Sequence, residues 1–146
     1  DLGAAPGGWS QVAAQKVGRG GKVIAIDILE MAPISGVTVL KGDFREALPE
    51  GVKADVILSD VSPNLSGIAN VDQARSLEFS LAAIELCRKA LKPDGVFVAK
   101  VFQGEAFDEF RERLQAAFAK VKVIKPAASR GESRETYAVA RGLLAL

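Results

Sequence analysis

Three aspartates stand at or just past the ends of short apolar runs: Asp27 closes "KVIAID", Asp43 lies in "VTVLKGDF" and Asp60 closes "ADVILSD". If these runs are parallel strands, their carboxyl ends meet at one edge of a sheet, where open α/β sheets bind ligands. A single aspartate there is explained equally well as a local cap. Three in register favour a shared binding edge.

The opening stretch "DLGAAPGGWSQ" places Gly3, Gly7 and Gly8 between a strand end and a helix start. Residues without a Cβ let the backbone pass close to a ligand, and the first turn of a helix offers unpaired N–H groups. Asp27 lies 20 residues after Gly7, a spacing at which a carboxylate can accept from both ribose hydroxyls of an adenosine. Asp43 could accept from the adenine amino group.

The glycine spacing differs from the dinucleotide pattern G-x-G-x-x-G, because Ala5 and Pro6 interrupt it. Proline removes an N–H donor that a pyrophosphate would need. The loop therefore predicts an adenosine ligand without phosphates, and S-adenosylmethionine fits better than NAD.

Lys100 lies near the end of "VFVAKVF", on a strand face shared with apolar residues. Such surroundings remove hydration from the ammonium, so the lysine should give up its proton more readily and could accept one in catalysis. A lysine that reaches to water at a strand end is the alternative. Glu135 opens the last predicted strand, where a carboxylate needs a cation; Lys100 is the favoured partner, with Arg130 and Arg134 in competition.

The composition excludes several kinds of chemistry. With no histidine and one cysteine, Cys87, the chain cannot build a Ser-His-Asp triad, a Cys-His pair or a His/Cys zinc site, and no metal is expected. No apolar run approaches the length of a membrane span, no leader resembles a signal peptide, and an intrachain disulfide is impossible. A cytoplasmic protein is expected.

Apolar runs alternate with amphipathic stretches, which predicts βαβ units and a mostly parallel α/β sheet with helices on both faces, in a single domain over 1–146. We expect strands over 22–27, 37–44, 54–60, 95–102, 120–126 and 135–142. Helices are expected over 9–17, 71–91 and 105–119. Asn70 and Gln73 resemble a capping box for the second helix, and "LKPDGVF" predicts a turn before the next strand.

Five segments in order resemble the FtsJ family of ribosomal RNA large-subunit 2′-O-methyltransferases: "DLGAAPGGWSQ", "GDFRE", "SDVSPNLSG", "VAKVFQGEAFDEF" and "SRGESRETYAVA". The resemblance runs through the whole chain. It implies a Rossmann-like class I methyltransferase fold with an antiparallel final strand. It also implies methyl transfer from S-adenosylmethionine to a ribose 2′-hydroxyl, of a uridine, in large-subunit ribosomal RNA.

The resemblance also implies roles for particular residues. The family's Lys-Asp-Lys-Glu catalytic set ends on Asp60, Lys100 and Glu135, with Lys100 as the proton acceptor. Its first lysine belongs to a helix ahead of the glycine-rich motif. We therefore expect that a preceding strand and helix are missing from this chain. Cofactor contacts are implied at Gly7, Trp9, Asp27, Asp43 and Asp60.

The formal net charge is only +1, but the end of the chain is basic. Lys120, Lys122, Lys125, Arg130, Arg134 and Arg141 stand there against Glu132 and Glu135. These cations could contact RNA phosphates, although solvated surface explains each of them too. The expected partner is large-subunit ribosomal RNA, bound by a monomer; whether the RNA is free or assembled into a subunit stays open.

Other functions are compatible with the same fold. A dehydrogenase would bring a histidine or a Tyr-x-x-x-Lys pair, whereas Tyr137 is followed four residues later by Arg141. Base-amine methyltransferases often carry Pro-Pro-Tyr or Pro-Pro-Phe after the strand-end acid, whereas Pro63 precedes Asn64 here. A non-catalytic RNA-binding module remains the main alternative, because the first catalytic lysine is not in the sequence.

Overall fold

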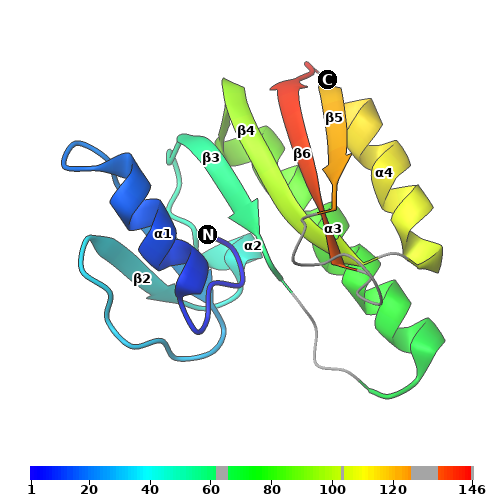
Figure 1. Ribbon diagram of the computed structural model, residues 1–146, viewed down its shortest axis with the longest axis horizontal. Helices are drawn as coiled ribbons and strands as arrows, with labels where there is room; N and C mark the ends of the chain where they lie inside the picture. The colour runs from blue at the N-terminus through cyan, green and yellow to red at the C-terminus, as the bar shows by residue number, and fades with distance from the viewer. Residues whose placement is uncertain (62–65, 103, 126–134, 146) are drawn as a thin grey trace. The chain divides into compact units, whose positions relative to one another are not determined.

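The computed structural model describes residues 1–61, 66–102, 104–125 and 135–145, and only the backbone of Phe102, Glu105 and Glu135. The chain divides into two compact units, Asp1–Val52 and Lys53–Leu146. Figure 1 labels the helices and strands of both, except the first strand of the first unit.

The first unit holds a two-stranded parallel sheet. The elements of this unit are α1 (Gly8–Val17), β1 (Val23–Asp27), β2 (Val37–Lys41) and the short α2 (Phe44–Ala47). The strands pair from Val23 opposite Val37 to Asp27 opposite Lys41, and Leu2 adds an isolated parallel bridge to Ile26. Parallel pairing brings the ends of both strands, and the acids that follow, to one edge, as predicted.

Glycines bound α1. Gly7 is its N-cap and Gly18 is its C-cap, and the Gly18 φ of 67° lies in the left-handed region that favours glycine. The glycine-rich "GRGG" therefore terminates the helix as predicted.

The second unit is a four-stranded mixed sheet in the order β3-β4-β6-β5. Its elements are β3 (Ala54–Ser59), α3 (Ala69–Ala90), β4 (Leu91–Phe102), α4 (Glu105–Ala117), β5 (Phe118–Ile124) and β6 (Glu135–Leu143). β3 and β4 are parallel, while β6 runs antiparallel to both β4 and β5. The predicted antiparallel final strand is confirmed.

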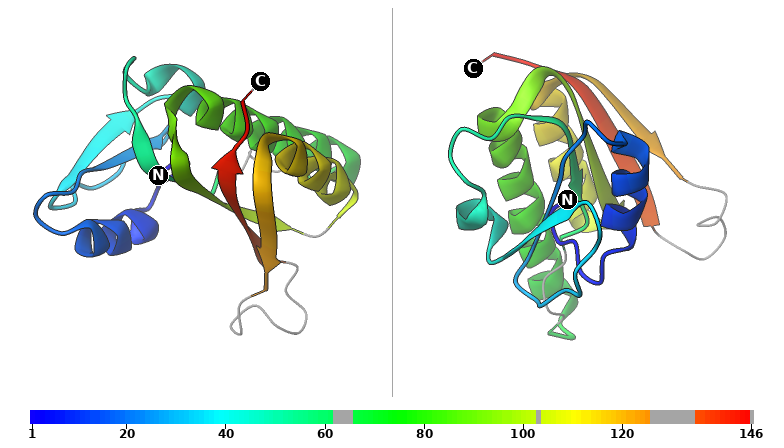
Figure 2. Two further views of the ribbon diagram at one scale, coloured as in Figure 1. Left: turned by 90° about the horizontal axis from the view of Figure 1, so that it is seen from above. Right: turned by 90° about the vertical axis from the view of Figure 1, so that its left-hand side faces the viewer.

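Alternate residues of the central strands form the core of this unit. Phe97, Ala99 and Val101 of β4 are buried, as are Ala138 and Ala140, which lie on the same face of β6. Helix α3 contributes Ala83, Ile84 and Cys87 to the core, and α4 contributes Phe107, Phe110 and Leu114. Both helices run alongside the sheet in Figure 2.

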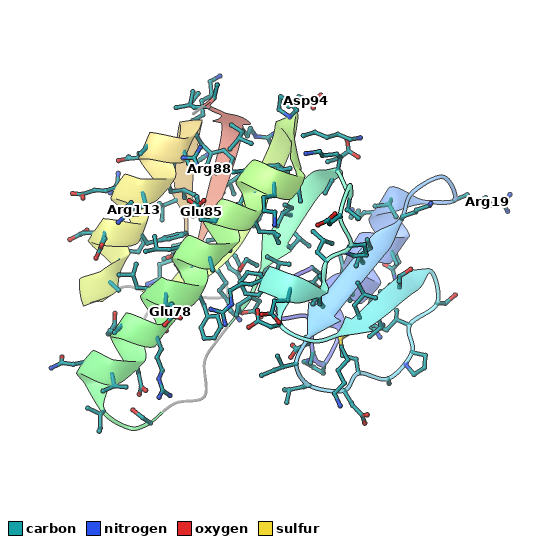
Figure 3. All side chains as sticks on the ribbon, turned by 180° about the vertical axis from the view of Figure 1, so that it is seen from behind. Arg19, Glu78, Glu85, Arg88, Asp94 and Arg113 are labelled. Atoms are coloured by element: carbon teal, nitrogen blue, oxygen red, sulfur yellow. The ribbon has the colours of Figure 1, made fainter. Side chains whose placement is uncertain are left out.

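The outer faces of these helices carry charge. Figure 3 looks onto them, with Glu78, Glu85 and Arg88 along α3 and Arg113 on α4. Arg88 Nε lies 3.7 Å from Glu85 Oε1, one turn away on α3. Apolar residues inward and charged residues outward explain why both segments are helices that pack on a sheet.

Several local predictions are wrong. The strand expected over 37–44 ends at Lys41, because Asp43 caps α2 and Phe44 is its first residue. Helix α3 begins at Ala69 with Ile68 as its N-cap and no side-chain cap, so Asn70 lies inside the helix and does not start a capping box. Phe118 opens β5 instead of ending the preceding helix.

The predicted "LKPDGVF" turn lies within β4 as an irregularity. Ala54 of β3 pairs with Leu91, whereas Val56 pairs with Val96, so the β4 side carries extra residues between the two pairs. Pro93 and Gly95 fall in this bulged stretch, where proline and glycine are tolerated.

Candidate functional site

Lys100 and Asp60 form an ion pair at the carboxyl ends of two neighbouring parallel strands. Ser59 of β3 pairs with Ala99 of β4, so the next residue of each strand reaches the same edge. Lys100 Nζ lies 2.9 Å from Asp60 Oδ1, and the two side chains are 21% and 30% exposed. The pair is thus partly shielded from solvent yet reachable from it.

Glu135 opens β6 beside this pair. Its backbone position is opposite Phe102, two residues along from Tyr137, which is opposite Lys100. The Glu135 side chain lies outside what the structure describes, so its pairing with Lys100 stays a prediction. The ion pair with Asp60 agrees with the expectation that Asp60 helps to hold Lys100.

A small cavity of about 70 Å³ adjoins the ion pair. The N-terminal half of α3 turns Gln73, Ser76 and Ser80 toward it, at the same helical spacing that places the apolar Ala83 and Cys87 in the core further on. A cavity of this size, with polar and apolar side chains in its lining, suits a hydroxyl or a water molecule better than an aromatic ring. Its lining comprises Asp60, Val61, Gln73, Ser76, Leu77, Ser80, Lys100, Val101, Ala106, Phe107 and Phe110.

The glycine-rich loop belongs to the first unit, and the backbone conformation at Gly7 favours glycine. Gly7 has φ of 124°, and a Cβ at this position would lie 2.6 Å from Ile34 Cδ1. The backbone conformation is the reason for glycine here, because the close atom is the end of the Ile34 side chain and can move aside. Ligand contact by Gly7 stays a prediction, as does contact by the half-buried Trp9 on α1.

Two backbone hydrogen bonds orient the Asp27 carboxylate at the end of β1. Its Oδ2 accepts from the Ala5 N–H at 2.9 Å and its Oδ1 accepts from the Leu29 N–H at 2.9 Å. The carboxylate thereby joins the glycine-rich loop to the segment after β1. Each oxygen keeps further acceptor capacity, because a carboxylate oxygen has more than one lone pair.

Asp43 has a clear local role. It is the N-cap of α2, accepting from the Arg45 N–H, and its carboxylate is also bound by the Arg45 guanidinium, with Nη2 2.6 Å from Oδ2. These bonds from Arg45 hold the pKa of Asp43 below its usual value. The local-cap explanation therefore holds for this aspartate, and its contact with an adenine amino group stays a prediction.

The first unit also contains an acceptor without a described donor. Asp1 Oδ2 accepts from the hydroxyl of the buried Ser10 at 2.7 Å, whereas Asp1 Oδ1 is buried and has no hydrogen-bond partner among the described residues. Buried carboxylate oxygens are costly when left unpaired. A donor or cationic group on a ligand, such as the ammonium of S-adenosylmethionine, fits this acceptor, and the hydrogen-bonded Asp27 carboxylate fits a ribose diol.

Some residues singled out in the sequence are not described by the structure, and the described part contains neither a metal-binding cluster nor a membrane-spanning helix. Arg130, Arg134, Pro63 and Asn64 lie outside the described residues. Within the described parts, no cluster of three or more His, Cys, Asp or Glu side chains is arranged to hold a metal ion. No helix described by the structure is both long and apolar enough to cross a membrane.

The described basic residues near the end of the chain lie on or just after the edge strand β5 and on its neighbour β6. Lys120, Lys122 and Lys125 of the β5 region are exposed, and Arg141 of β6 is exposed opposite Lys120. Like charges that face each other across a strand pair repel, so this position suits an anionic partner.

Solved structures define the class of fold. An S-adenosylmethionine-dependent O-methyltransferase from Thermotoga maritima superposes with a TM-score of 0.70 at 20% identity, and the match covers 99% of this chain and 59% of the Thermotoga chain. A candidate ribosomal RNA methyltransferase from Plasmodium falciparum superposes with a TM-score of 0.84 at 25% identity, covering 100% of this chain and 86% of its own. The predicted Rossmann-like methyltransferase fold is confirmed.

Sequence comparison narrows the class to a family. The model of the FtsJ-like methyltransferases matches residues 1–143, and the chain belongs to this family. Ribosomal RNA large subunit methyltransferase E of Marinobacter nauticus is 49% identical over 150 residues, which cover 97% of this chain and 72% of the relative. The enzyme of that name from Nitrosospira multiformis is 51% identical, covering 97% and 73%.

Proposed function

We propose that this methyltransferase transfers a methyl group from S-adenosylmethionine to a ribose 2′-hydroxyl, that of a uridine, in large-subunit ribosomal RNA. Family membership and the relatives named ribosomal RNA large subunit methyltransferase E support the reaction class and the substrate. The single observation that carries the mechanism is the ion pair between Lys100 and Asp60 at the carboxyl edge of β3 and β4.

In this proposal the cofactor is held by side chains and backbone from several strand ends. Asp27 accepts from the ribose of its adenosine, in an orientation already fixed by the Ala5 and Leu29 N–H groups. When bound, S-adenosylmethionine supplies the methyl group as an electrophile on a sulfonium centre. The proposed contacts are Gly7, Trp9, Asp27, Asp43 and Asp60.

Lys100 is the proposed proton acceptor. A ribose 2′-hydroxyl is a weak nucleophile that must lose its proton as it attacks, so a base within hydrogen-bond reach accelerates the reaction. Lys100 can serve only in its neutral form. Asp60 and Glu135 are proposed to orient the lysine, so that much of the rate gain comes from positioning.

The RNA is proposed to lie against the basic end of the chain. The exposed Lys120, Lys122 and Arg141 support phosphate contacts, which fix the RNA without reading its bases. The proposal has three finer parts: the protein acts in the cytoplasm, it acts as a monomer, and it needs no metal. The RNA substrate is either free or assembled into a subunit.

Methyl transfer from labelled S-adenosylmethionine to large-subunit ribosomal RNA lacking its modifications tests the function. A 2′-O-methyl group removes the nucleophile that alkali uses to cleave RNA, so the label should appear in alkali-resistant dinucleotides and map to a uridine. Label released in mononucleotides would indicate base methylation. RNA binding without label transfer would favour the non-catalytic module.

A further inference from the structure

The N-terminus of α4 is capped by a side chain from another helix. The Ala106 N–H, in the first turn of α4, donates to Gln73 Oε1 of α3 at 3.2 Å. Residue Gly104 occupies the N-cap position and supplies no side-chain cap. The N–H groups in the first turn of a helix normally donate to the side chain of the N-cap residue. Here Gln73 of α3 supplies that acceptor in place of Gly104.

Gly104 and Gln73 fit each other. A Cβ on Gly104 would lie 2.8 Å from Gln73 Nε2 and 3.0 Å from Gln73 Oε1. The backbone at Gly104 is extended, with φ of 170°, so conformation does not require glycine there. The Gln73 amide lies where a side chain on Gly104 would begin, so any side chain there would have to displace the amide.

This hydrogen bond joins the segments that follow the two strands of the candidate site. Asp60 follows β3 and leads to α3, which carries Gln73; Lys100 is in β4, which leads to α4 and Ala106. Gln73, Asp60 and Lys100 line the same cavity. The Lys100–Asp60 pair connects the ends of β3 and β4, and the hydrogen bond between Gln73 and Ala106 is a second connection, between the helices that follow these strands.

We infer that Gln73 is a positioning residue: by holding the first turn of α4 against α3, it sets the Lys100 ammonium relative to Asp60. The inference rests on the proposed role of Lys100 in methyl transfer. A displacement near 1 Å at a reacting group can lower a rate by about 100-fold, so a loss of about tenfold is expected when this link is cut.

The test separates a positioning role from helix capping by replacing the Gln73 cap with a cap from residue 104. Gln73→Ala removes both the cap and the link between helices. Adding Gly104→Ser to Gln73→Ala places a hydroxyl at the N-cap, in space that the shortened side chain has vacated, and restores a local cap without the link. Gln115→Ala, at an exposed glutamine of α4, is the matched control.

Gln73→Ala should lower both the melting temperature and the methyl transfer rate at saturating RNA and cofactor. The double variant should regain the melting temperature while its rate stays about tenfold low. Recovery of rate and melting temperature together would show that Gln73 acts only as a cap and would overturn the inference. Full activity in Gln73→Ala would overturn it as well.

A readout without substrate keeps this inference distinct from the proposed function. In protein labelled with ¹³C-lysine, the Lys100 Cε resonance, assigned by its loss in Lys100→Ala, should shift toward the exposed lysines in the double variant. If wild type transfers no methyl group but this shift occurs, the proposed function fails and the positioning role stands. An unchanged resonance would contradict the positioning role.

Discussion

Lys100 Nζ lies 2.9 Å from Asp60 Oδ1, and a second lysine on the same strand makes a similar contact. Lys92 Nζ of β4 lies 3.1 Å from Asp55 Oδ1 of β3, at the opposite end of the two strands. The second pair is more exposed, with side chains 43% and 80% accessible, and Lys92 does not line the cavity. The two pairs join the same strands, so Lys92 is a matched control for Lys100.

Asp27→Ala should weaken S-adenosylmethionine binding by about 1 to 3 kcal/mol, because the ribose hydroxyls lose a charged acceptor. The measurement is calorimetric titration. Glu30→Ala is the control, since Glu30 is an exposed acid three residues later whose described ion pair, with Lys41, is at the surface. Equal affinity in Asp27→Ala and wild type would remove Asp27 from the site.

Asp72 should stabilise the start of α3 in a pH-dependent way. Its carboxylate accepts from the Ser66 N–H, the Ser66 hydroxyl and the Gly67 N–H, which hold the pKa of Asp72 below its ordinary value of 3.8. Because the folded pKa is the lower one, the stabilisation is complete above pH 3.8 and is lost as the pH falls through the folded pKa.

Melting curves of wild type and Asp72→Asn across this range test the prediction. Wild type should melt higher at neutral pH, and the gap should close in acid. A gap that persists unchanged to low pH would mean that the carboxylate charge has no part in holding this turn.

Cys87 should be inert toward thiol reagents in the folded protein. Its side chain is fully buried in the core of the second unit, and burial raises the pKa of the thiol to about 12. Labelling at pH 8 should therefore follow the unfolding of this unit by urea. Rapid labelling in native buffer would contradict the core described for α3.

Replacing Lys120 and Lys122 together by Ala should flatten the salt dependence of RNA binding. Each phosphate contact that is lost lowers the slope of log affinity against log salt by about 1. Lys89→Ala, an exposed lysine at the end of α3, is the control. An unchanged slope in the double variant would place the RNA away from β5.

The fold could be predicted largely from periodicity. The apolar run 95–102 predicted a strand, and the Phe107, Phe110 and Leu114 spacing predicted a helix with one apolar face. Both elements form; in the strand, Phe97, Ala99 and Val101 are buried while the residues between them are only half-buried, whereas we expected a strand covered on both faces. Element ends were less predictable. Phe118 continues the apolar spacing of α4, but it stacks on Phe97 at a ring distance of 6.1 Å as the first residue of β5.

The site could be predicted only in part, because sequence shows which residues end strands but not which partners they choose. Asp60 and Lys100 were expected at the binding edge, yet their mutual contact depends on the β3–β4 register. Gln73 was assigned to a cap on its own helix and instead caps α4, 33 residues further on. Asp43 was predicted from its strand-end position, while its bond to Arg45 is set by the local turn.

The most direct test of the central claim is the single-turnover rate of methyl transfer in Lys100→Arg. Arginine keeps the positive charge beside Asp60 but stays protonated at any working pH, so it cannot accept the 2′-hydroxyl proton. The account predicts that Lys100→Arg and Lys100→Ala both lose transfer while cofactor affinity stays close to that of wild type, and that Lys92→Arg is fully active. A near-normal rate in Lys100→Arg would contradict the role of Lys100 as proton acceptor.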